Sequence, residues 1–373
     1  MRFSTLILTA VFLVVASFSS LLAQNLEIYV SDAGNFNLPP WQILKFDENG
    51  ENPEVFISES LAWPQDILFL EDQGIVLISN FSTNRINKYD AKDGHYLGIF
   101  KTGISGPTRM KIGADGLLYV LQWSGTGRVK RYQLDGTFVG DFTNVGVPES
   151  IGLDWDKDGN LYVSSYYDGL VHKFGVNGED LGLFINSNLM GPTNIWFDAN
   201  GDLLVLDYDG TSVKRFNSEG VYQGSFIGGL SKTEGVDFFP NGNILIGNGA
   251  TSSVKMYDSE GNYIKDLVPS GSANLKNPNA VIIRDPTSVA IEEVDFAANF
   301  VTPTVGTNFN FISQNSLNFD WIEVFSTSGT FVERIEMKNH SIWNASEYAE
   351  GLYILVAKRG NKVVATQKVL VQH

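Results

Sequence analysis

The sequence predicts an all-β protein, a six-bladed β-propeller followed by a small β-sandwich. Three observations predict this fold class. A short strand motif recurs six times at intervals near 42 residues, and that interval suits a unit of four short strands. The strands of these units can be counted, and the count fits a ring closed between its N- and C-terminal strands. Residues 301–373 differ in charge from the rest and contain a few short strand-like runs.

Residues 1–23 have the pattern of a secretory signal peptide. Arg2 is the only charge in the first 26 residues, and an apolar run extends from Leu6 to Val15. This run is shorter than the ~20 residues that a membrane-spanning helix needs, and small residues follow it, as at a cleavage site. We therefore expect an exported mature protein that begins at Gln24 and has no transmembrane anchor.

The repeated motif consists of an apolar residue, polar or basic residues and an aromatic residue. The intervals between successive copies are 43, 43, 42, 42 and 41 residues. Periods of this size indicate stacked copies of one supersecondary unit. The copies are Ile43–Phe46, Ile86–Tyr89, Val129–Tyr132, Val171–Phe174, Val213–Phe216 and Val254–Tyr257.

One unit, which begins at Pro148, shows how four strands fit into the interval. Asp156–Asn160 and Asn177-Gly178 are turn sequences, because Asp, Asn and Gly tolerate left-handed backbone angles. The runs between these turns are apolar and β-branched or aromatic, which favours strands. We expect strands at 151–154, 161–164, 170–174 and 181–184.

Strand counting predicts how the ring closes. The last innermost strand, Ala280–Arg284, has no downstream partners, and the first strand, Ile28–Ser31, has no upstream one. Pairing the two segments in one sheet removes two free edges. The propeller is therefore expected to span residues 24–285, with a linker at 286–300, where Asp285-Pro286 interrupts the pattern.

These units resemble the NHL repeat. Pro148–Phe174 is the closest copy, with the proline entry, the Asp-x-x-Gly-Asn-Leu-Tyr-Val turn and strand, and the basic–aromatic third strand. The resemblance covers about 26–285 and implies an NHL-like six-bladed propeller.

The C-terminal segment, 301–373, has a charge balance of its own. It contains six basic and six acidic residues, whereas 24–300 contains 19 basic and 36 acidic residues, a net charge of −17. Its strand-like runs, separated by turn residues, indicate a small β-sandwich. The expected strands are 321–325, 331–335, 352–356 and 362–371.

This segment resembles the type A (Por-type) sorting domain of the type IX secretion system of Bacteroidetes. The matching pieces are Ile322–Phe325 with Gly329, Glu350–Leu355, and Gly360–Val371. The resemblance implies that the type IX machinery is a partner. It also implies export across the outer membrane, removal of the tail, and release or attachment at the cell surface. An ordinary accessory β domain is the alternative.

Composition excludes several functions. The formal charge of −16 argues against nucleic acid and anionic membranes as partners. The absence of cysteine excludes disulfides, thiolate metal sites and cysteine nucleophiles. Four histidines make a multi-histidine metal cluster improbable.

Function is expected on the face formed by the entries to the innermost strands and the loops after the second strands. Aromatic rings there offer flat surfaces for stacking, so the face is predicted to bind a glycan, peptide or protein; packing between blades is the alternative. The opposite face is expected to carry turn chemistry only. The candidate ligand-binding residues are Phe81, Arg109, Trp123, Tyr166, Tyr167 and Tyr208.

A second hypothesis places Ca²⁺ or Mg²⁺ at the central opening, because oxygen ligands without His or Cys suit these ions. Thr233–Gly235 and Pro278-Asn279 resemble fragments of gluconolactonase-like propellers, which implies metal-dependent hydrolysis of lactones. Hydration of the tunnel mouth is the alternative. The candidate metal ligands are Asp66, Glu149, Asn194, Glu234 and Asn279.

Two functions follow from these patterns. The preferred one is an extracellular binding or interaction module without catalysis. The alternative is a metal-dependent hydrolase or lyase, with Glu149 and Glu234 as its carboxylates. A third pattern, the acidic run Asp154–Asn160, begins like a calcium loop but has Ser165 where such a loop needs a bidentate Glu, so a turn is expected there.

Overall fold

The computed structural model describes residues 26–286 and 300–373, except 312–318, 327–330, 338–341 and 360–361. The chain divides into two compact units, Met1–Pro286 and Thr287–His373, and each is described by itself. The predicted signal peptide and most of the predicted linker lie outside the described residues. Within the described ranges, no helix has the length and apolar character needed to cross a bilayer.

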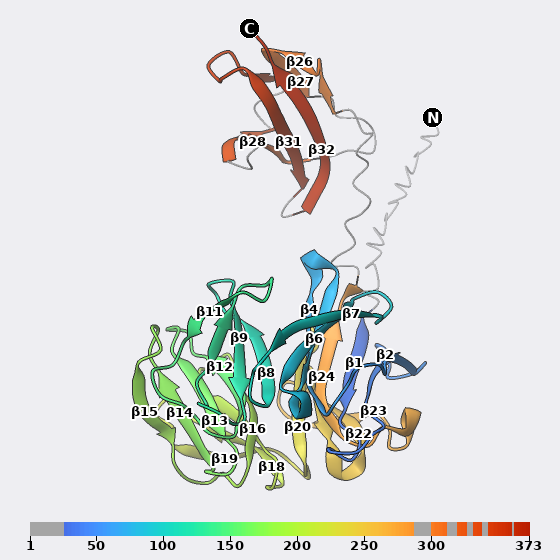
Figure 1. Cartoon of the computed structure of the whole chain (residues 1–373), viewed down its shortest axis with the longest axis vertical. Helices are drawn as coiled ribbons and strands as arrows, with labels where there is room; N and C mark the ends of the chain where they lie inside the picture. The colour runs from blue at the N-terminus through green and yellow to red at the C-terminus, as the bar shows by residue number, and fades with distance from the viewer. Residues whose placement is uncertain (1–25, 287–299, 312–318, 327–330, 338–341, 360–361) are drawn as a thin grey trace, which may run out of the picture. The chain divides into compact units, whose positions relative to one another are not determined.

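The first unit is built from six four-stranded antiparallel sheets (Figure 1). From the innermost strand outward, the first two are β24 (Pro278–Arg284), β1 (Glu27–Asp32), β2 (Gln42–Asp47), β3 (Glu54–Ile57), and β4 (Pro64–Leu70), β5 (Ile75–Asn80), β6 (Arg85–Asp90), β7 (Tyr96–Thr102). The next two are β8 (Pro107–Ile112), β9 (Leu118–Gln122), β10 (Lys130–Tyr132), β11 (Phe138–Asp141), and β12 (Ser150–Trp155), β13 (Leu161–Ser165), β14 (Leu170–Phe174), β15 (Asp180–Ile185). The last two are β16 (Pro192–Phe197), β17 (Leu203–Asp207), β18 (Ser212–Phe216), β19 (Tyr222–Gly228), and β20 (Thr233–Phe238), β21 (Ile244–Asn248), β22 (Ser253–Tyr257), β23 (Tyr263–Val268).

The innermost strands connect the sheets to one another. They contact each other in the cyclic order β24, β4, β8, β12, β16, β20 and back to β24. The first sheet joins distant parts of the chain, because β24 pairs antiparallel with β1 and sets Arg284 opposite Glu27. Short 3-10 turns, η1 (Glu71–Gln73), η2 (Phe81–Thr83), η3 (Gly249–Thr251) and η4 (Ser272–Asn274), complete the unit.

The repeated sequence motif forms the third strand of each sheet. Its apolar and aromatic ends are buried, as Val171 and Phe174 show at 0% exposure. Most of the basic residues between them stay partly exposed and pair with acidic side chains; Lys255 lies 2.7 Å from Asp266, for example. One motif thus supplies both packing between sheets and neutralisation of the acidic surface.

Six apolar clusters fill the spaces between neighbouring sheets. Each contains side chains from two adjacent sheets, including the pair formed by the sixth and first sheets, where Leu245 packs with Ile28 and Val281. Strands covered on both faces need apolar residues on both faces, which explains why the strands carry few charges.

Buried hydroxyl groups add polar links between adjacent sheets. Each donates to a backbone carbonyl on the innermost strand of the next sheet, so a polar side chain in the core has its hydrogen bond. These links are Ser31 to Pro64 (2.8 Å), Ser79 to Thr108 (2.8 Å), Thr108 to Ser150 (2.7 Å), Ser164 to Thr193 (2.7 Å) and Thr193 to Thr233 (2.8 Å).

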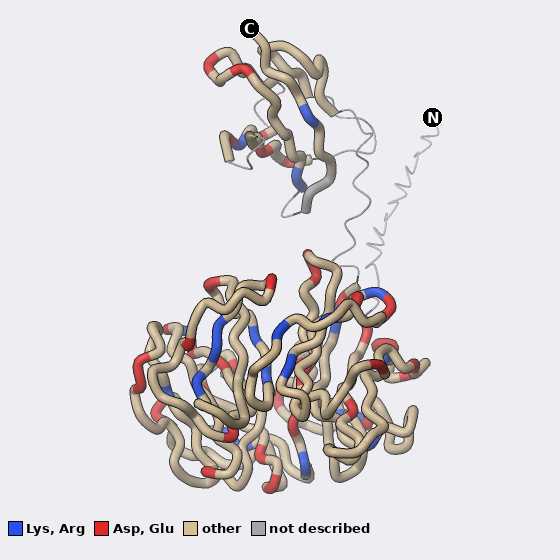
Figure 2. Tube along the Cα trace, in the orientation of Figure 1, with Lys and Arg blue, Asp and Glu red and all other residues tan. Residues whose placement is uncertain are grey.

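The antiparallel order gives the first unit two distinct faces. The loop face carries the entries to the innermost strands and the loops after the second strands. The turn face carries the tight turns that join first to second and third to fourth strands. Figure 2 shows many of the acidic residues at turns and several Lys and Arg residues within strands.

The second unit consists of two sheets that share one core. The three-stranded sheet contains β25 (Val301–Thr302), β27 (Asn308–Phe311) and β30 (Ile342–Asn344). The five-stranded sheet contains β26 (Val305–Gly306), β32 (Lys362–Val371), β31 (Gly351–Arg359), β28 (Trp321–Ser326) and β29 (Phe331–Glu336). Phe309 and Trp343 of the first pack with Ile322 and Leu355 of the second. Strands β25, β26, β27 and β30 were absent from the sequence expectation, because these runs are only two to four residues long and three of them contain Asn or Gly, which are depleted in strands.

Candidate functional site

A pocket of about 360 Å³ opens on the loop face of the first unit. Side chains from the sheets all around the central opening form its wall, and most of them are aromatic. Its lining residues are Phe36, Trp63, Gln65, Phe81, Trp123, Ile151, Tyr166, Tyr167, Thr193, Tyr208, Lys232 and Glu234. Five of the six predicted ligand-binding residues are among them, so the structure brings these five together.

The aromatic side chains form a continuous arc around the pocket. Successive rings contact one another at tilted or edge-to-face angles, which the charge distribution of aromatic rings favours. The ring centroids are 5.0 Å apart for Phe36–Trp63, 4.5 Å for Trp63–Phe81, 5.8 Å for Phe81–Trp123, 5.7 Å for Trp123–Tyr166 and 5.8 Å for Tyr166–Tyr208. Tyr167 joins the arc through Trp123 at 5.6 Å and remains 73% exposed.

Repeat position explains the arc. Phe81, Trp123, Tyr166 and Tyr208 each follow the last residue of a second strand, and they are spaced by 42, 43 and 42 residues. Four successive sheets therefore present one aromatic side chain each at the same level. The sixth sheet has Gly249 at this position, so the arc is open there.

Polar residues at the ends of the second strands hold the loops in place. Asn80 accepts the backbone N–H of Ala62 (2.8 Å), and Asn248 accepts that of Ser231 (2.8 Å). Asp207 accepts two backbone N–H groups in the same way, from Met190 and Gly191. These side chains fix the loop backbone, and with it the positions of Phe81 and Tyr208, which follow Asn80 and Asp207.

Sequence reasoning missed Trp63 and Lys232 as pocket residues. Both immediately precede an innermost strand, and both have left-handed backbone angles, with φ of 52° and 57°. Glu149 occupies the same repeat position with φ of 48°. The signal was available, because aligning the units at their innermost strands places all three residues at the mouth of the central opening.

The floor of the pocket is a buried polar cluster centred on Arg109. This residue is 4% exposed and contacts the lining residue Glu234. Its guanidinium donates to the backbone carbonyls of Gln65, Glu234 (3.2 Å) and Asn279 (2.7 Å). It also lies 3.5 Å from the carboxylate of Asp66 and 3.2 Å from that of Glu234. Arg109 therefore ties three innermost strands together rather than standing free for a ligand.

Burial governs the acidity of the two carboxyl groups in this cluster. Burial raises the pKa of Glu234 to about 7, against the lowering effect of Arg109. Burial also raises the pKa of Asp66, whose other oxygen accepts the backbone N–H of Met110 at 2.7 Å. Glu234 is thus a carboxyl group that titrates near neutrality at the bottom of an aromatic pocket.

The predicted metal ligands divide into two groups. Asp66, Glu234 and Asn279 converge, and the Arg109 guanidinium lies among them. Glu149 and Asn194 are half-buried and do not line the pocket. A metal ion held by the first group would have to compete with a cation that the protein supplies itself, so a calcium or magnesium site at the opening stays a prediction.

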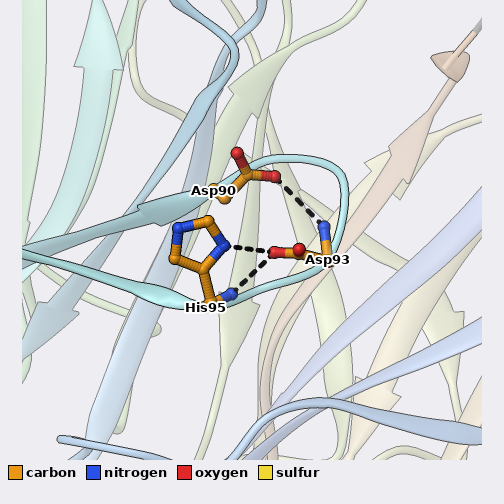
Figure 3. A group of neighbouring side chains, drawn as sticks. All are labelled: Asp90, Asp93 and His95. Carbon is orange, nitrogen blue, oxygen red and sulfur yellow. Dashed lines mark hydrogen bonds and ion pairs between the residues drawn. The ribbon is translucent and has the colours of Figure 1, made fainter.

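One group of acidic and histidine side chains has the spacing of metal ligands in the described part of the chain. It consists of Asp90, Asp93 and His95 in the hairpin between β6 and β7 (Figure 3). Asp93 accepts the His95 ring nitrogen at 2.6 Å, and this hydrogen bond raises the pKa of the imidazole. The side chains are largely exposed and satisfy the backbone of their own turn, which accounts for their proximity.

The turn face has a cavity of its own, which corrects the expectation of turns only. It measures about 840 Å³ and lies between the fifth and sixth sheets, with Trp196, Phe226 and Phe238 among its lining residues. The acidic run at Asp156 is a turn, as expected: its carboxylate accepts the N–H groups of Asp158 (3.0 Å) and Asn160 (2.9 Å).

No protein-family model matches this chain, and no curated protein matches it.

Structure comparison finds many similar chains. One belongs to a nidogen/laminin complex, with a TM-score of 0.57 and 16% identity over 69% of this chain and 98% of the other. A protein of unknown function from Bacteroides caccae has a TM-score of 0.55 and 16% identity, again over 69% of this chain and 98% of the other. A candidate gluconolactonase has a TM-score of 0.48 and 19% identity over 56% of this chain and 78% of the other. The first two likenesses, together with the four-stranded sheets, show that the first unit has a β-propeller fold.

Proposed function

We propose that the chain is an extracellular binding protein whose ligand occupies the aromatic pocket of an NHL-like, six-bladed propeller. The six sheets, the cyclic contacts of the innermost strands and the pairing of β24 with β1 support six blades and closure across the chain ends. Closed propellers place ligands at the loops around the central opening, where this pocket lies.

The observation that carries the proposal is the arc of aromatic side chains. Rings that only filled space between blades would be buried, yet Tyr167 is 73% exposed and the other rings of the arc are half-buried around an open pocket. Such rings offer a ligand large contact area with little loss of side-chain freedom. Gln65, Thr193 and Glu234 add polar groups at the floor, which orient a ligand.

Binding to an array of soluble glycans and peptides tests the proposal. We expect the wild-type chain, without residues 1–23, to bind at least one ligand class. We expect Tyr167→Ala to weaken that binding by about tenfold, as for a ring at the centre of an interface. Tyr263→Ala is the matched control, because Tyr263 is an exposed tyrosine (57%) on the outer strand β23. Equal binding by both variants and wild type contradicts the proposal.

Export by the type IX secretion system is proposed for the second unit. The motifs of residues 301–373 and their arrangement in a small two-sheet unit support a sorting domain. A host with that machinery should deliver the full chain to the cell surface or medium without its tail. Deleting residues 301–373 should retain the protein in the periplasm, and unchanged delivery after the deletion contradicts this role.

A hydrolase is the second candidate, and one observation favours it. Glu234 lines the pocket with a pKa raised by burial to about 7, which suits a general acid or base near neutral pH. Turnover of a lactone panel with and without Ca²⁺ and Mg²⁺ tests it, with Glu234→Gln as the decisive variant. Activity that survives this substitution, or no turnover by wild type, removes the candidate.

A further inference from the structure

We propose that the aromatic pocket binds the ammonium group of its ligand, between the aromatic arc and the carboxylate of Glu234. This inference rests on the proposed binding function and names the chemical class of group that the pocket takes. It depends on three features of the described residues: an unbalanced buried charge, a free carboxylate oxygen and a wall of rings.

The buried cluster holds more negative than positive charge. Asp66 and Glu234, each 5% exposed, share the single guanidinium of Arg109. The guanidinium directs its remaining hydrogen bonds to uncharged backbone carbonyls. Deeper along β20, Asp237 adds a third carboxyl group, which accepts the backbone N–H of Ile283. Against the raising effect of burial, the ammonium of Lys111 lowers the pKa of both Asp66 and Asp237, but it pairs with a further carboxylate, that of Asp154. A buried charge without a full partner is costly, and burial raises the pKa of both Asp66 and Glu234. The cluster is therefore neutralised either by a bound proton or by one further cation.

Glu234 is placed to receive that cation. The Oε1 atom of Glu234 lies 3.2 Å from the Arg109 guanidinium. Oε1 also accepts a hydrogen bond from the side-chain amide nitrogen of Gln65 (2.8 Å). In this orientation the Gln65 amide oxygen accepts hydrogen bonds from the side chains of Trp63 (2.6 Å) and Asn279 (2.8 Å). Its other oxygen, Oε2, has no hydrogen bond from any residue that the structure describes. Since Glu234 lines the pocket, this oxygen is a free acceptor at the pocket floor.

The rings above Glu234 suit an organic cation. The faces of Trp, Tyr and Phe attract ammonium groups, most strongly where water is excluded. The pocket wall already contains one such contact, because the Lys232 ammonium lies 4.7 Å from the centre of the Tyr208 ring. Lys232 does not balance Glu234, since its ammonium pairs with Asp209 at the rim. A hydrated metal ion, by contrast, gains little from aromatic walls.

Choline and its uncharged isostere 3,3-dimethylbutan-1-ol are the probes that separate charge from shape. Titration calorimetry with the full mature chain at pH 8 measures both. We expect choline to bind at least ~10-fold more tightly than the isostere, as a desolvated cation–π contact and a carboxylate partner require. Equal affinities overturn the inference, and so does the absence of saturable choline binding.

Glu234→Gln removes the charge while it keeps the shape of the side chain. We expect it to reduce choline affinity by at least ~10-fold and to leave the affinity for the isostere unchanged. Glu219→Gln is the matched control, because Glu219 is exposed in the turn between β18 and β19. Unchanged choline affinity in Glu234→Gln, with the melting temperature retained, overturns the inference.

Proton release gives a readout that needs no variant. The pKa of Glu234 lies near 7 in the empty pocket, and a bound cation lowers it. Calorimetry at pH 7 in two buffers of different ionisation enthalpy should therefore show protons released with choline but not with the isostere. Equal release with both probes overturns the inference. The proposed function survives that result if Tyr167→Ala still weakens an array ligand, and it fails if no array ligand binds.

Discussion

The loop face and the turn face of the propeller are built from the same repeats, but the residues of the turn face are similar from repeat to repeat and those of the loop face are not. On the turn face, Asp or Asn carboxylate and amide groups accept backbone N–H groups of their own turns, as Asp156, Asn217 and Asp258 do. On the loop face, the side chain after each second strand ranges from aromatic to glycine. The repeats thus keep the turn residues that the fold needs on the turn face, whereas the loop residues differ between repeats and can form a binding site.

The largest expected difference between the faces concerns their arginines. Arg109→Met leaves two buried carboxyl groups without their cation, so we expect a loss of ~3–5 kcal/mol in the free energy of unfolding at pH 8. Arg215→Met on the turn face should cost ~1 kcal/mol or less, because Arg215 is partly exposed where it pairs with Asp198. Urea unfolding measures both, and equal losses would show that the loop-face cluster has no special role.

The pH dependence of stability isolates Glu234. Burial raises its pKa from 4.5 to about 7, so the unfolded chain ionises this group at lower pH than the folded chain does. Its contribution to stability is fully present below pH ~4.5 and is lost as the pH rises through 7. Glu234→Gln cannot ionise, so its stability relative to wild type should rise by up to ~3 kcal/mol between pH 4.5 and 8.

A second buried carboxyl group, that of Asp237, also titrates in this pH range and must be separated from Glu234. Burial raises the pKa of Asp237 to about 6, and this group is present in both proteins, so its effect cancels in the difference. Urea unfolding at a series of pH values supplies the comparison. A difference between Glu234→Gln and wild type that stays flat with pH refutes the assignment of Glu234 as the buried titrating group.

Substituting one phenylalanine in each pocket compares their contributions to ligand binding. Phe81 belongs to the arc on the loop face, whereas Phe238 lines the turn-face cavity and is 40% exposed. We expect Phe81→Ala to weaken ligand binding by about tenfold and Phe238→Ala to leave it unchanged. Calorimetry with choline or with an array ligand measures both, and the reverse order of effects would move the site to the turn face.

The smallest expected effect concerns the hydroxyl links between sheets. Ser164 donates to the carbonyl of Thr193 in the next sheet, so Ser164→Ala should cost ~1 kcal/mol in the free energy of unfolding. Ser218→Ala, at an exposed turn, should cost less than ~0.5 kcal/mol. Chemical unfolding distinguishes the two, and an equal effect would mean that the links do not stabilise the contact between sheets.

Sequence reasoning predicted the fold well because periodicity is a local signal repeated many times. The third-strand motif fixed the number of units, and the aromatic residues of the loop face were identified from their loops. Convergence was harder to predict. The sequence contains Asp66, Arg109 and Glu234 at separations of 43 and 125 residues, and only the contacts between innermost strands bring them together.

Arg109 shows why the surroundings of a residue cannot be predicted from its repeat position alone. It was expected to bind ligand because it occurs at an innermost-strand entry on the loop face. In the structure, its long side chain reaches across the channel to the carbonyls of Gln65 and Asn279. Repeat position determines the level of a residue in the ring, but not whether a long side chain turns outward or inward.

Fluorine NMR of the chain labelled with 5-fluorotryptophan tests the central claim most directly. The sequence has seven tryptophans; Trp63 and Trp123 line the loop-face pocket, and Trp196 lines the turn-face cavity. We predict that choline shifts the resonances of Trp63 and Trp123, which substitution assigns, and leaves that of Trp196 in place. A shift of Trp196 alone, or no shift under saturating choline, would contradict the claim that the aromatic pocket binds choline.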